Sequence, residues 1–242
     1  GNLAAGFNML DPIKCTIVTP GLNMDGRFEK TGIPASIVTK YLAEHGVVVE
    51  KTGLYSFFIM FTIGITKGRW NTLVTALQQF KDDHDKNQPM WRVMPKFCAQ
   101  MASRAGGARY ERMGLKDMCQ MVHQMYARHG IARLTTDMYL SELTPAMRPA
   151  DAYAAIAQRN TERVPIDQLE GRITTSLVTP YPPGIPLLIP GEVFNKKIVD
   201  YLKFSRAFSQ ECPGFETDIH GLVEEVDNKG QVSYFADCVK QT

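Results

Sequence analysis

The chain has 242 residues, of which 44% are hydrophobic, and a formal net charge of +2 at pH 7. This size and composition suffice for a packed core in one large domain or two small ones. Its Lys and Arg residues are scattered, which argues against a nucleic-acid or membrane surface, and no apolar run reaches the roughly 18 residues of a membrane span. The first residues show no signal-peptide pattern.

The five cysteines are isolated from one another, and none forms a CxxC pair: Cys15, Cys98, Cys119, Cys212 and Cys238. An odd number without close spacing argues against a disulfide framework and against a metal site. We therefore expect free thiols in a reducing compartment, which indicates a cytoplasmic protein.

The chain begins with Gly-Asn-Leu-Ala-Ala rather than Met and soon reaches a strand-like segment, so we expect it to be a piece of a longer protein. Residues 13–19 are β-rich and are followed by the turn signal Pro20-Gly21, which predicts a strand. Residues 34–46 predict a helix, because Pro lies in the first turn, apolar residues recur at helical spacing and Gly46 follows.

Two apolar runs follow, at residues 47–52 and 54–63, and predict strands that are buried on both faces. Residues 67–85 predict a second helix, whose apolar positions recur at helical spacing: Trp70, Leu73, Val74, Leu77 and Phe80. This strand–helix–strand–strand–helix order predicts an α+β layer with the helices against one sheet.

The composition changes near residues 87–89, where we place a boundary. Beyond it, apolar spacing, caps and turn residues predict three helices, one strand and a closing hairpin. These are helices at residues 115–128, 149–159 and 196–210, a strand at 173–179, and hairpin strands at 222–226 and 232–239 around a turn at 227–230.

The common sequence signatures of catalysis and metal binding are absent: the chain contains no glycine-rich phosphate loop, no GxSxG and no HExxH. The five histidines are dispersed, and we interpret each as structural or surface-exposed: His45, His84, His123, His129 and His220. One acidic residue stands out, because Glu50 lies inside an apolar strand-like run. A buried carboxylate must be paired or functional, so an internal ion pair or an edge position is the alternative to a functional role.

Two further stretches have an unusual composition. Residues 179–186 contain four prolines and predict a rigid, extended loop that walls a pocket or, as we favour, crosses the surface. In residues 213–221, Glu216, Asp218 and His220 alternate, so on a strand all three would share one side. We favour a hydrogen-bonded polar cluster over a metal site there.

Six motifs, taken in chain order, resemble those of the large bacterial ornithine/lysine/arginine decarboxylases. They are MLDPIK (residues 9–14), TPG (19–21), GIPASIV (32–38), EHGVVVEKTG (44–53), TPYPPGIPLLIPGE (179–192) and PGFETDIHG (213–221). The resemblance runs from about residue 8 to the C-terminus, and the shared order makes the set far more specific than any single motif.

The resemblance implies a fold-type-I enzyme that uses pyridoxal phosphate (PLP), in which a wing domain and a large PLP-binding domain precede the part seen here. Residues 1–88 would form a small α+β domain like that of aspartate aminotransferase. Residues 89–242 would form a second α+β unit, the C-terminal domain of the ornithine/lysine/arginine decarboxylases.

The chemistry of the family depends on a lysine, within a Ser-x-His-Lys motif, that forms a Schiff base with PLP, and on an Asp that pairs with the pyridinium nitrogen. No Ser-x-His-Lys occurs in this chain, and its aspartates do not match the cofactor residue of the family. We therefore expect no catalytic, cofactor-binding or metal-binding residue here, and no activity from this piece alone.

Glu50, in the EKTG motif, resembles a glutamate that family members place near the distal end of the substrate. A carboxylate in a partly dry pocket attracts the terminal ammonium of lysine or ornithine. A structural ion pair, for example with Lys51, is the competing interpretation.

The resemblance leaves lysine, arginine and ornithine open as substrates. Residues 50–53 look more like lysine decarboxylases and residues 64–70 more like arginine decarboxylases; we favour lysine, because a lone carboxylate suits a compact ammonium. The resemblance also implies a homo-oligomer, a dimer or a larger ring, that acts in amino-acid catabolism and acid resistance. The alternatives are a non-catalytic assembly or regulatory module and another fold-type-I PLP enzyme such as an aminotransferase, against which YPPGIP and FETDIHG argue.

Overall fold

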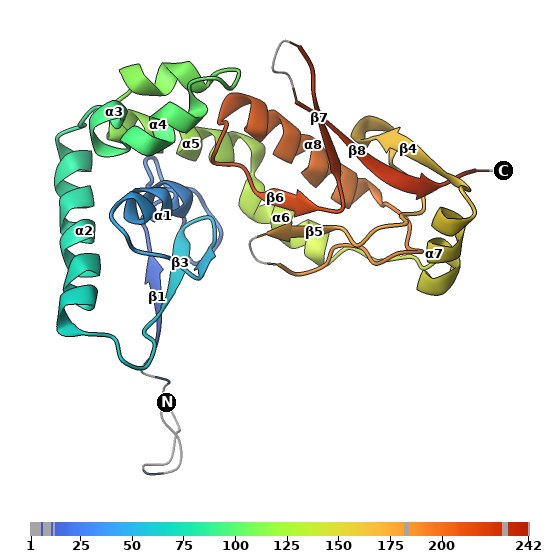
Figure 1. The fold of residues 1–242 in the computed structure, drawn as a ribbon, viewed down its shortest axis with the longest axis horizontal. Helices are drawn as coiled ribbons and strands as arrows, with labels where there is room; N and C mark the ends of the chain where they lie inside the picture. The colour runs from blue at the N-terminus through green and yellow to red at the C-terminus, as the bar shows by residue number, and fades with distance from the viewer. Residues whose placement is uncertain (1–5, 7–10, 12, 182–183, 229–231, 242) are drawn as a thin grey trace.

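The structure, a computed structural model, describes residues 6, 11, 13–181, 184–228 and 232–241. In Figure 1 the chain runs from a three-stranded sheet at one end, through a group of helices, to further strands at the other end. The mixture of helices and antiparallel sheets confirms the predicted α+β class. Of the residues described, no helix is both long enough and apolar enough to span a membrane.

The N-terminal part has the predicted strand–helix–strand–strand–helix order: β1 (Lys14–Val18), α1 (Ala35–Glu44), β2 (Lys51–Thr52), β3 (Ser56–Met60) and α2 (Lys67–Asp85). The strands form an antiparallel sheet in the order β1-β3-β2, with Cys15 opposite Ile59. Helix α1 packs on the sheet and α2 packs on α1, where the Tyr41 hydroxyl donates to the Asp83 carboxylate at 2.7 Å.

Two strand predictions for this part are wrong. Strand β3 is buried on one face only: Phe57 and Ile59 lie in the core, whereas Met60 is exposed, because the helices cover one side of the sheet. Of residues 47–52, only Lys51–Thr52 form a strand. The N–H groups of residues 45–47 instead donate to the last carbonyls of α1 and cap that helix.

Helix α2 has the predicted bounds, but its predicted apolar stripe is only partly buried. Leu73 and Phe80 lie in the core, whereas Trp70 and Val74 are exposed. Helix α1 reaches α2 near its C-terminal end, where Tyr41 packs edge-on against Phe80 at 5.2 Å between ring centroids.

A group of helices follows, and only one of them was predicted: α3 (Met90–Val93), α4 (Pro95–Met101), the 3₁₀ helix η1 (Gly107–Arg112), α5 (Leu115–His129) and α6 (Ile131–Tyr139). Helix α5 confirms the prediction and ends at Gly130, whose φ of +57° suits glycine. The other four are short, so their apolar spacing carries little signal in the sequence.

The C-terminal part contains α7 (Pro149–Ala157), β4 (Thr161–Pro165), the 3₁₀ helix η2 (Ile166–Gln168), β5 (Thr179–Tyr181), α8 (Lys196–Glu211), β6 (Asp218–His220), β7 (Val223–Val226) and β8 (Val232–Val239). Strands β4, β8 and β7 form an antiparallel sheet in that order, and β5 pairs with β6. The predicted helices and hairpin strands are confirmed, whereas residues 229–230 of the predicted turn lie outside the described residues.

The strand predicted at residues 173–179 is mostly wrong. Residues 173–178 make only isolated bridges, to Val193, Cys238 and Leu188, and Thr179 alone belongs to strand β5. The facing stretch between Leu188 and Val193 contains Pro190, which lacks the N–H that a continuous ladder needs.

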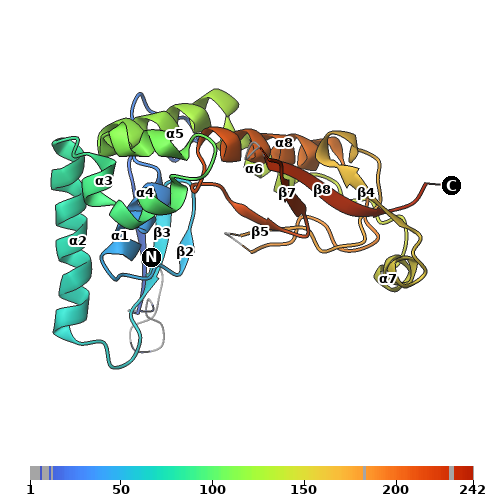
Figure 2. The ribbon, with the colours of Figure 1, turned by 45° about the horizontal axis from the view of Figure 1, so that its top comes forward.

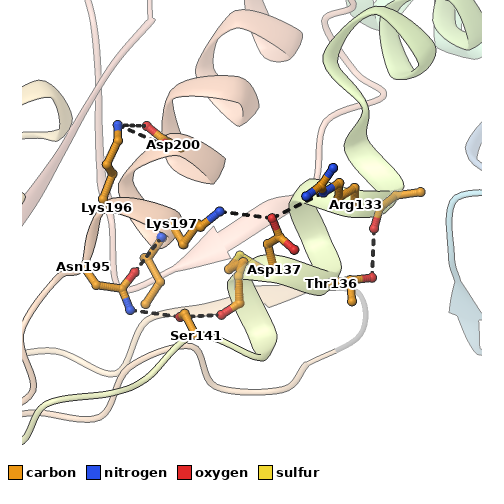
Figure 3. Close-up of polar contacts among 11 residues, drawn as sticks. Arg133, Thr136, Asp137, Ser141, Asn195, Lys196, Lys197 and Asp200 are labelled. Carbon is orange, nitrogen blue, oxygen red and sulfur yellow. Dashed lines mark hydrogen bonds and ion pairs between the residues drawn. The ribbon is translucent and has the colours of Figure 1, made fainter.

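The end of α6 is joined to the start of α8 by a polar network (Figure 3). The Asn195 Oδ1 accepts from the Ile198 N–H at 3.0 Å and caps α8, while its Nδ2 donates to the Ser141 hydroxyl at 2.9 Å. In the first turn of α8, the Lys197 ammonium pairs with Asp137 of α6 at 3.1 Å. These contacts fix the N-terminal end of α8 to α6.

One continuous core connects the two ends of the molecule. Figure 2 shows α5 and α8 lying along the same side, and Tyr126 of α5 stacks on Phe208 of α8 at 5.2 Å between centroids. On the N-terminal side, His123 of α5 is 1% exposed and hydrogen-bonded at both ring nitrogens, to the Tyr55 hydroxyl at 2.6 Å and to the Glu29 carbonyl at 2.9 Å. These contacts cross the predicted boundary at residues 88/89, which stays a prediction.

The substitution His123→Ala should lower the free energy of unfolding by about 3 kcal/mol, because it leaves a cavity and removes a partner from the buried Tyr55 hydroxyl. Urea denaturation measures the change. Gln124→Ala, on the exposed face of the same helix, is the control and should change stability by less than about 0.5 kcal/mol. Equal stability of the two variants would show that His123 does not hold α5 to the N-terminal part.

Candidate functional site

Two neighbouring cavities lie between α1, α8 and the segment that follows α8. Their volumes are about 420 and 370 Å³, and four residues line both: Lys40, Ser205, Glu216 and Thr217. We call the 420 Å³ space the larger cavity and the 370 Å³ space the smaller cavity. The shared residues come from both ends of the sequence, so the site exists only once the N-terminal and C-terminal parts have packed together.

The turn at Pro213-Gly214 positions Glu216. Gly214 has a φ of +87°, and a Cβ there would lie 2.6 Å from the Met101 Sδ and 2.7 Å from the Phe97 ring, so only glycine fits. The Tyr110 hydroxyl donates to the Pro213 carbonyl at 2.9 Å and fixes the turn. The chain then runs beside α4 and presents Glu216 to the cavities.

The polar groups of the larger cavity are unevenly paired. The Arg104 Nη1 donates to the Glu216 Oε1 at 2.6 Å, whereas the Glu216 Oε2 is buried and accepts no hydrogen bond from any described residue. The Lys40 Nζ lies 5.7 Å from the centre of the Phe97 ring and forms no ion pair within the described part of the chain. Burial lowers the pKa of Lys40, and the nearby Glu216 opposes that shift only in part.

The smaller cavity has mostly apolar walls, with aromatic rings from α5, α8 and the following turn: Tyr126, Tyr201, Phe204, Phe208 and Phe215. Two hydroxyls in its lining are buried without a hydrogen-bond partner among the described residues. They are the Tyr139 hydroxyl and the Ser36 Oγ. The cavity is therefore lined mainly by apolar side chains, and two hydroxyl groups are buried in its wall.

Glu50 is exposed and lies in a bend just before β2, outside the lining of both cavities. This corrects the interpretation of a carboxylate inside a buried strand. Its N–H donates to the Phe58 carbonyl at 2.9 Å, which fixes the backbone, while its carboxylate forms no ion pair with any residue that the structure describes. The expected alternative of a pair with Lys51 is therefore absent, and the carboxylate is free to meet another group.

The proline-rich loop and the alternating acidic residues are also placed by the structure. In residues 179–186, Tyr181 and Ile185 are exposed and line neither cavity, as expected for a surface crossing; residues 182–183 lie outside the described residues. Asp218 and His220 share one side of β6, with 3.3 Å between the His220 Nε2 and the Asp218 Oδ2.

Glu216 does not share that side, because β6 begins only at Asp218 and Glu216 turns toward Arg104. Over the described ranges, no three His, Cys, Asp or Glu residues are grouped to hold a metal ion. Sequence analysis missed Lys40 and Arg104, since neither lies in a recognisable catalytic motif. In the sequence, these two residues are marked only by a positive charge close to apolar positions that become buried.

Two sequence models of one family match the chain. The model for the major domain of the Orn/Lys/Arg decarboxylases matches residues 1–69, and the model for their C-terminal domain matches residues 132–240. The chain belongs to the Orn/Lys/Arg decarboxylase family. Among curated relatives of this family, it is 45% identical over its whole length to lysine decarboxylase LdcA of Pseudomonas aeruginosa, and 36% identical over 97% of its length to the biodegradative arginine decarboxylase of Escherichia coli.

The fold agrees with solved structures of the Orn/Lys/Arg decarboxylases. The constitutive lysine decarboxylase of Escherichia coli matches 96% of this chain with a TM-score of 0.85 and 35% identity. The match covers 32% of that chain, and likewise 32% of LdcA and 30% of the arginine decarboxylase. The chain therefore spans about a third of the length of the relatives it matches.

Orn/Lys/Arg decarboxylases in general depend on PLP, and the residues of the larger cavity can be compared with what this cofactor requires. PLP needs an amine, a carboxylate for its pyridinium nitrogen and cationic or backbone donors for its phosphate. Lys40 supplies an amine, but both guanidinium groups of the larger cavity are already paired, Arg104 with Glu216 and Arg206 with Asp167. The cavity residues therefore do not fit PLP.

Lys40→Met should raise the free energy of unfolding at pH 7 by about 1 kcal/mol, because it removes a buried ammonium that lacks a direct carboxylate partner. The pKa of Lys40 is lowered from 10.5 in the folded state, so the cost is fully present below the folded pKa and disappears as the pH rises toward 10.5. The stability gained by Lys40→Met should therefore shrink as the pH rises from the folded-state pKa of Lys40 toward 10.5. Lys30→Met, at an exposed lysine, is the control. A stability loss larger than that of Lys30→Met at every pH would contradict this.

Proposed function

We propose that the protein to which this chain belongs decarboxylates a basic amino acid, with lysine as the preferred substrate and PLP as the cofactor. The similarity over the whole chain to lysine decarboxylase LdcA supports this, together with the match of both family models. The relatives also include an arginine and an ornithine decarboxylase, so arginine and ornithine are the alternative substrates.

Glu50 is the residue we propose for substrate binding in this chain. Its carboxylate is exposed and unpaired among the described residues, and its backbone is held by the bond to Phe58. The turn that follows is rigid, since the Gly53 N–H donates to the Ser56 carbonyl at 2.7 Å. A carboxylate in such a place can bind and orient the terminal ammonium of lysine, a compact charge that needs no bidentate partner.

Bound PLP would supply the electron sink for loss of the carboxylate as CO₂. We propose that its lysine and its other ligands lie outside the 242 residues of this chain. On this proposal the chain divides into a small domain (residues 1–88) and a C-terminal domain (residues 89–242), and it contributes Glu50 and packing surfaces rather than reacting groups.

The protein would work as a cytoplasmic homo-oligomer in amino-acid catabolism and acid resistance. Exposed apolar side chains near and on α2, among them Ile63, Trp70 and Val74, support further packing against the rest of the protein or another subunit. The same surface favours the second candidate function, a non-catalytic assembly module. A gene that continues upstream into a Ser-x-His-Lys motif would support the decarboxylase function. A gene that starts near residue 1 would support the non-catalytic assembly module.

In the full-length protein, Glu50→Gln should raise KM for lysine about tenfold or more while leaving PLP binding intact, because the amide no longer pairs with the ammonium. Steady-state kinetics with lysine, arginine and ornithine in parallel measure this. The control is Glu170→Gln, at an exposed glutamate without a side-chain partner in the described structure. An unchanged KM for all three amino acids would exclude Glu50 from substrate binding.

The 242-residue chain alone should neither bind PLP productively nor release CO₂ from lysine, because it contains no Ser-x-His-Lys. Absorbance in the visible region after PLP addition, with and without borohydride, tests binding, and CO₂ release tests activity. The full-length protein is the positive control. A stoichiometric band abolished by borohydride, or cofactor-dependent CO₂ release by the chain, would overturn this expectation.

A further inference from the structure

Helix α2 extends beyond the rest of the N-terminal part. Figures 1 and 2 show it at the outer edge of the molecule, with its C-terminal end near α3 and its N-terminal end away from it. Residues 67–72, which form its first turns, are all exposed, and Leu73 is its first buried residue. Because a helix in a protein is stabilised mainly by the packing of its apolar face, these turns have little to hold them within the described part of the chain.

The local sequence is also unfavourable for the start of a helix. Thr66, the N-cap residue, makes no side-chain cap hydrogen bond, and the first turn contains no acidic residue. It contains instead two cations, Lys67 and Arg69, which form no ion pair with a described residue and lie at the positive end of the helix dipole. Gly68 adds a residue of low helix propensity. A neighbouring surface that presents carboxylates would pair both cations and complement the dipole.

Exposed apolar side chains gather at the same end of the N-terminal part. We call them the edge patch, and they come from the start of β1, the end of β3, the loop that follows and α2: Ile13, Met60, Ile63, Ile65, Trp70 and Val74. The Phe61 N–H donates to the Ile13 carbonyl at 2.7 Å, which holds the start of β1 beside the end of β3. Trp70 and Val74 lie one turn apart on α2. Apolar side chains gathered in this way mark an interaction surface.

The protein that precedes these residues is the occupant that best fits the edge patch. The model for the major domain of the family matches residues 1–69, and the chain spans about a third of the length of its relatives. On the proposed function, more of that domain lies upstream and joins the chain ahead of β1, beside the patch. An attached segment has a high effective concentration, so a small patch suffices. A separate second copy needs more, since a stable interface takes about 20–30 residues on each side.

We propose that the edge patch is the docking surface for the part of the same polypeptide that precedes this chain. The docked surface is apolar where it covers Trp70 and Val74, and it presents carboxylates to Lys67, Arg69 and the first N–H groups of α2. This rests on the proposed function in one respect, that further protein lies upstream. Docking would order the first turns of α2, which open readily in the 242-residue chain alone.

Hydrogen exchange, measured by mass spectrometry on the 242-residue chain and on the full-length protein, tests the docking. The amides of residues 67–72 should exchange at least about tenfold more slowly in the full-length protein, because docking closes these turns. The amides of residues 76–85 are the internal control. They should exchange at similar rates in both forms, since Ala76 and Phe80 already lie in the core of the 242-residue chain.

Two variants examine the apolar and the charged parts of the surface. In the full-length protein, Trp70→Ala should raise the exchange rate of residues 67–72 at least about tenfold, because it removes apolar contact area. Trp91→Ala, at an exposed tryptophan on α3 outside the edge patch, is the matched control and should leave that rate unchanged. Arg69→Glu should slow the exchange in the 242-residue chain, where the helix dipole favours an acidic residue, and speed it in the full-length protein, where the new carboxylate meets others.

Equal exchange of residues 67–72 in both forms, no effect of Trp70→Ala, or an effect of Arg69→Glu with the same sign in both would overturn the proposal. So would protection that appears in the 242-residue chain as its concentration rises, which would identify a second copy as the occupant. Exchange does not depend on catalysis. A full-length protein that decarboxylates lysine but leaves residues 67–72 unprotected would therefore contradict the docking alone, and one that protects them without decarboxylating would contradict the proposed function alone.

Discussion

The hydrogen bonds of His123 are the contact on which the arrangement of the molecule depends. The ring lies in the core, takes one bond from the Tyr55 hydroxyl and gives one to the Glu29 carbonyl, and so ties helix α5 to the N-terminal sheet. Gly32 is part of this constraint, because a Cβ there would collide with the ring of His123. Since α5 also stacks on α8 through Tyr126, the same helix fixes the distance between α1 and the C-terminal part.

The cavities are a consequence of that distance. Helix α1 brings Lys40, and the turn after α8 brings Glu216, to the two sides of a space that neither fills. A folded chain normally pairs such groups, because burial of charge without a partner is costly. Lys40 and Glu216 nevertheless stay unpaired with each other. Binding sites often contain such costly groups, which make the folded protein less stable than its packing would permit. Glu50 is the opposite case, an exposed carboxylate whose desolvation would come only from a molecule or domain bound over it.

Local signals predicted a large part of the fold. The bounds of α2 and the start of α8 agree with residues read from apolar spacing and caps, and Gly130 ends α5 as expected. The errors occur where the decisive partner is distant or absent from the local pattern. Residues 45–47 cap α1 with their N–H groups, and residues 173–178 face a stretch interrupted by Pro190. The short helix α6 depends on contacts with α8, which no local window contains.

The sequence by itself determined the family, through the order of its motifs, and also the longer helices and the closing hairpin, because each depends on residues close together in the chain. It also identified Glu50 as a residue to examine, but not its exposure. Only the tertiary structure decided that Glu216 turns away from Asp218 and His220 and pairs with Arg104, and that Lys40 faces it unpaired. The physical reason is that these atoms belong to residues up to 176 positions apart, such as Lys40 and Glu216, whose separation is set by core packing rather than by any local pattern.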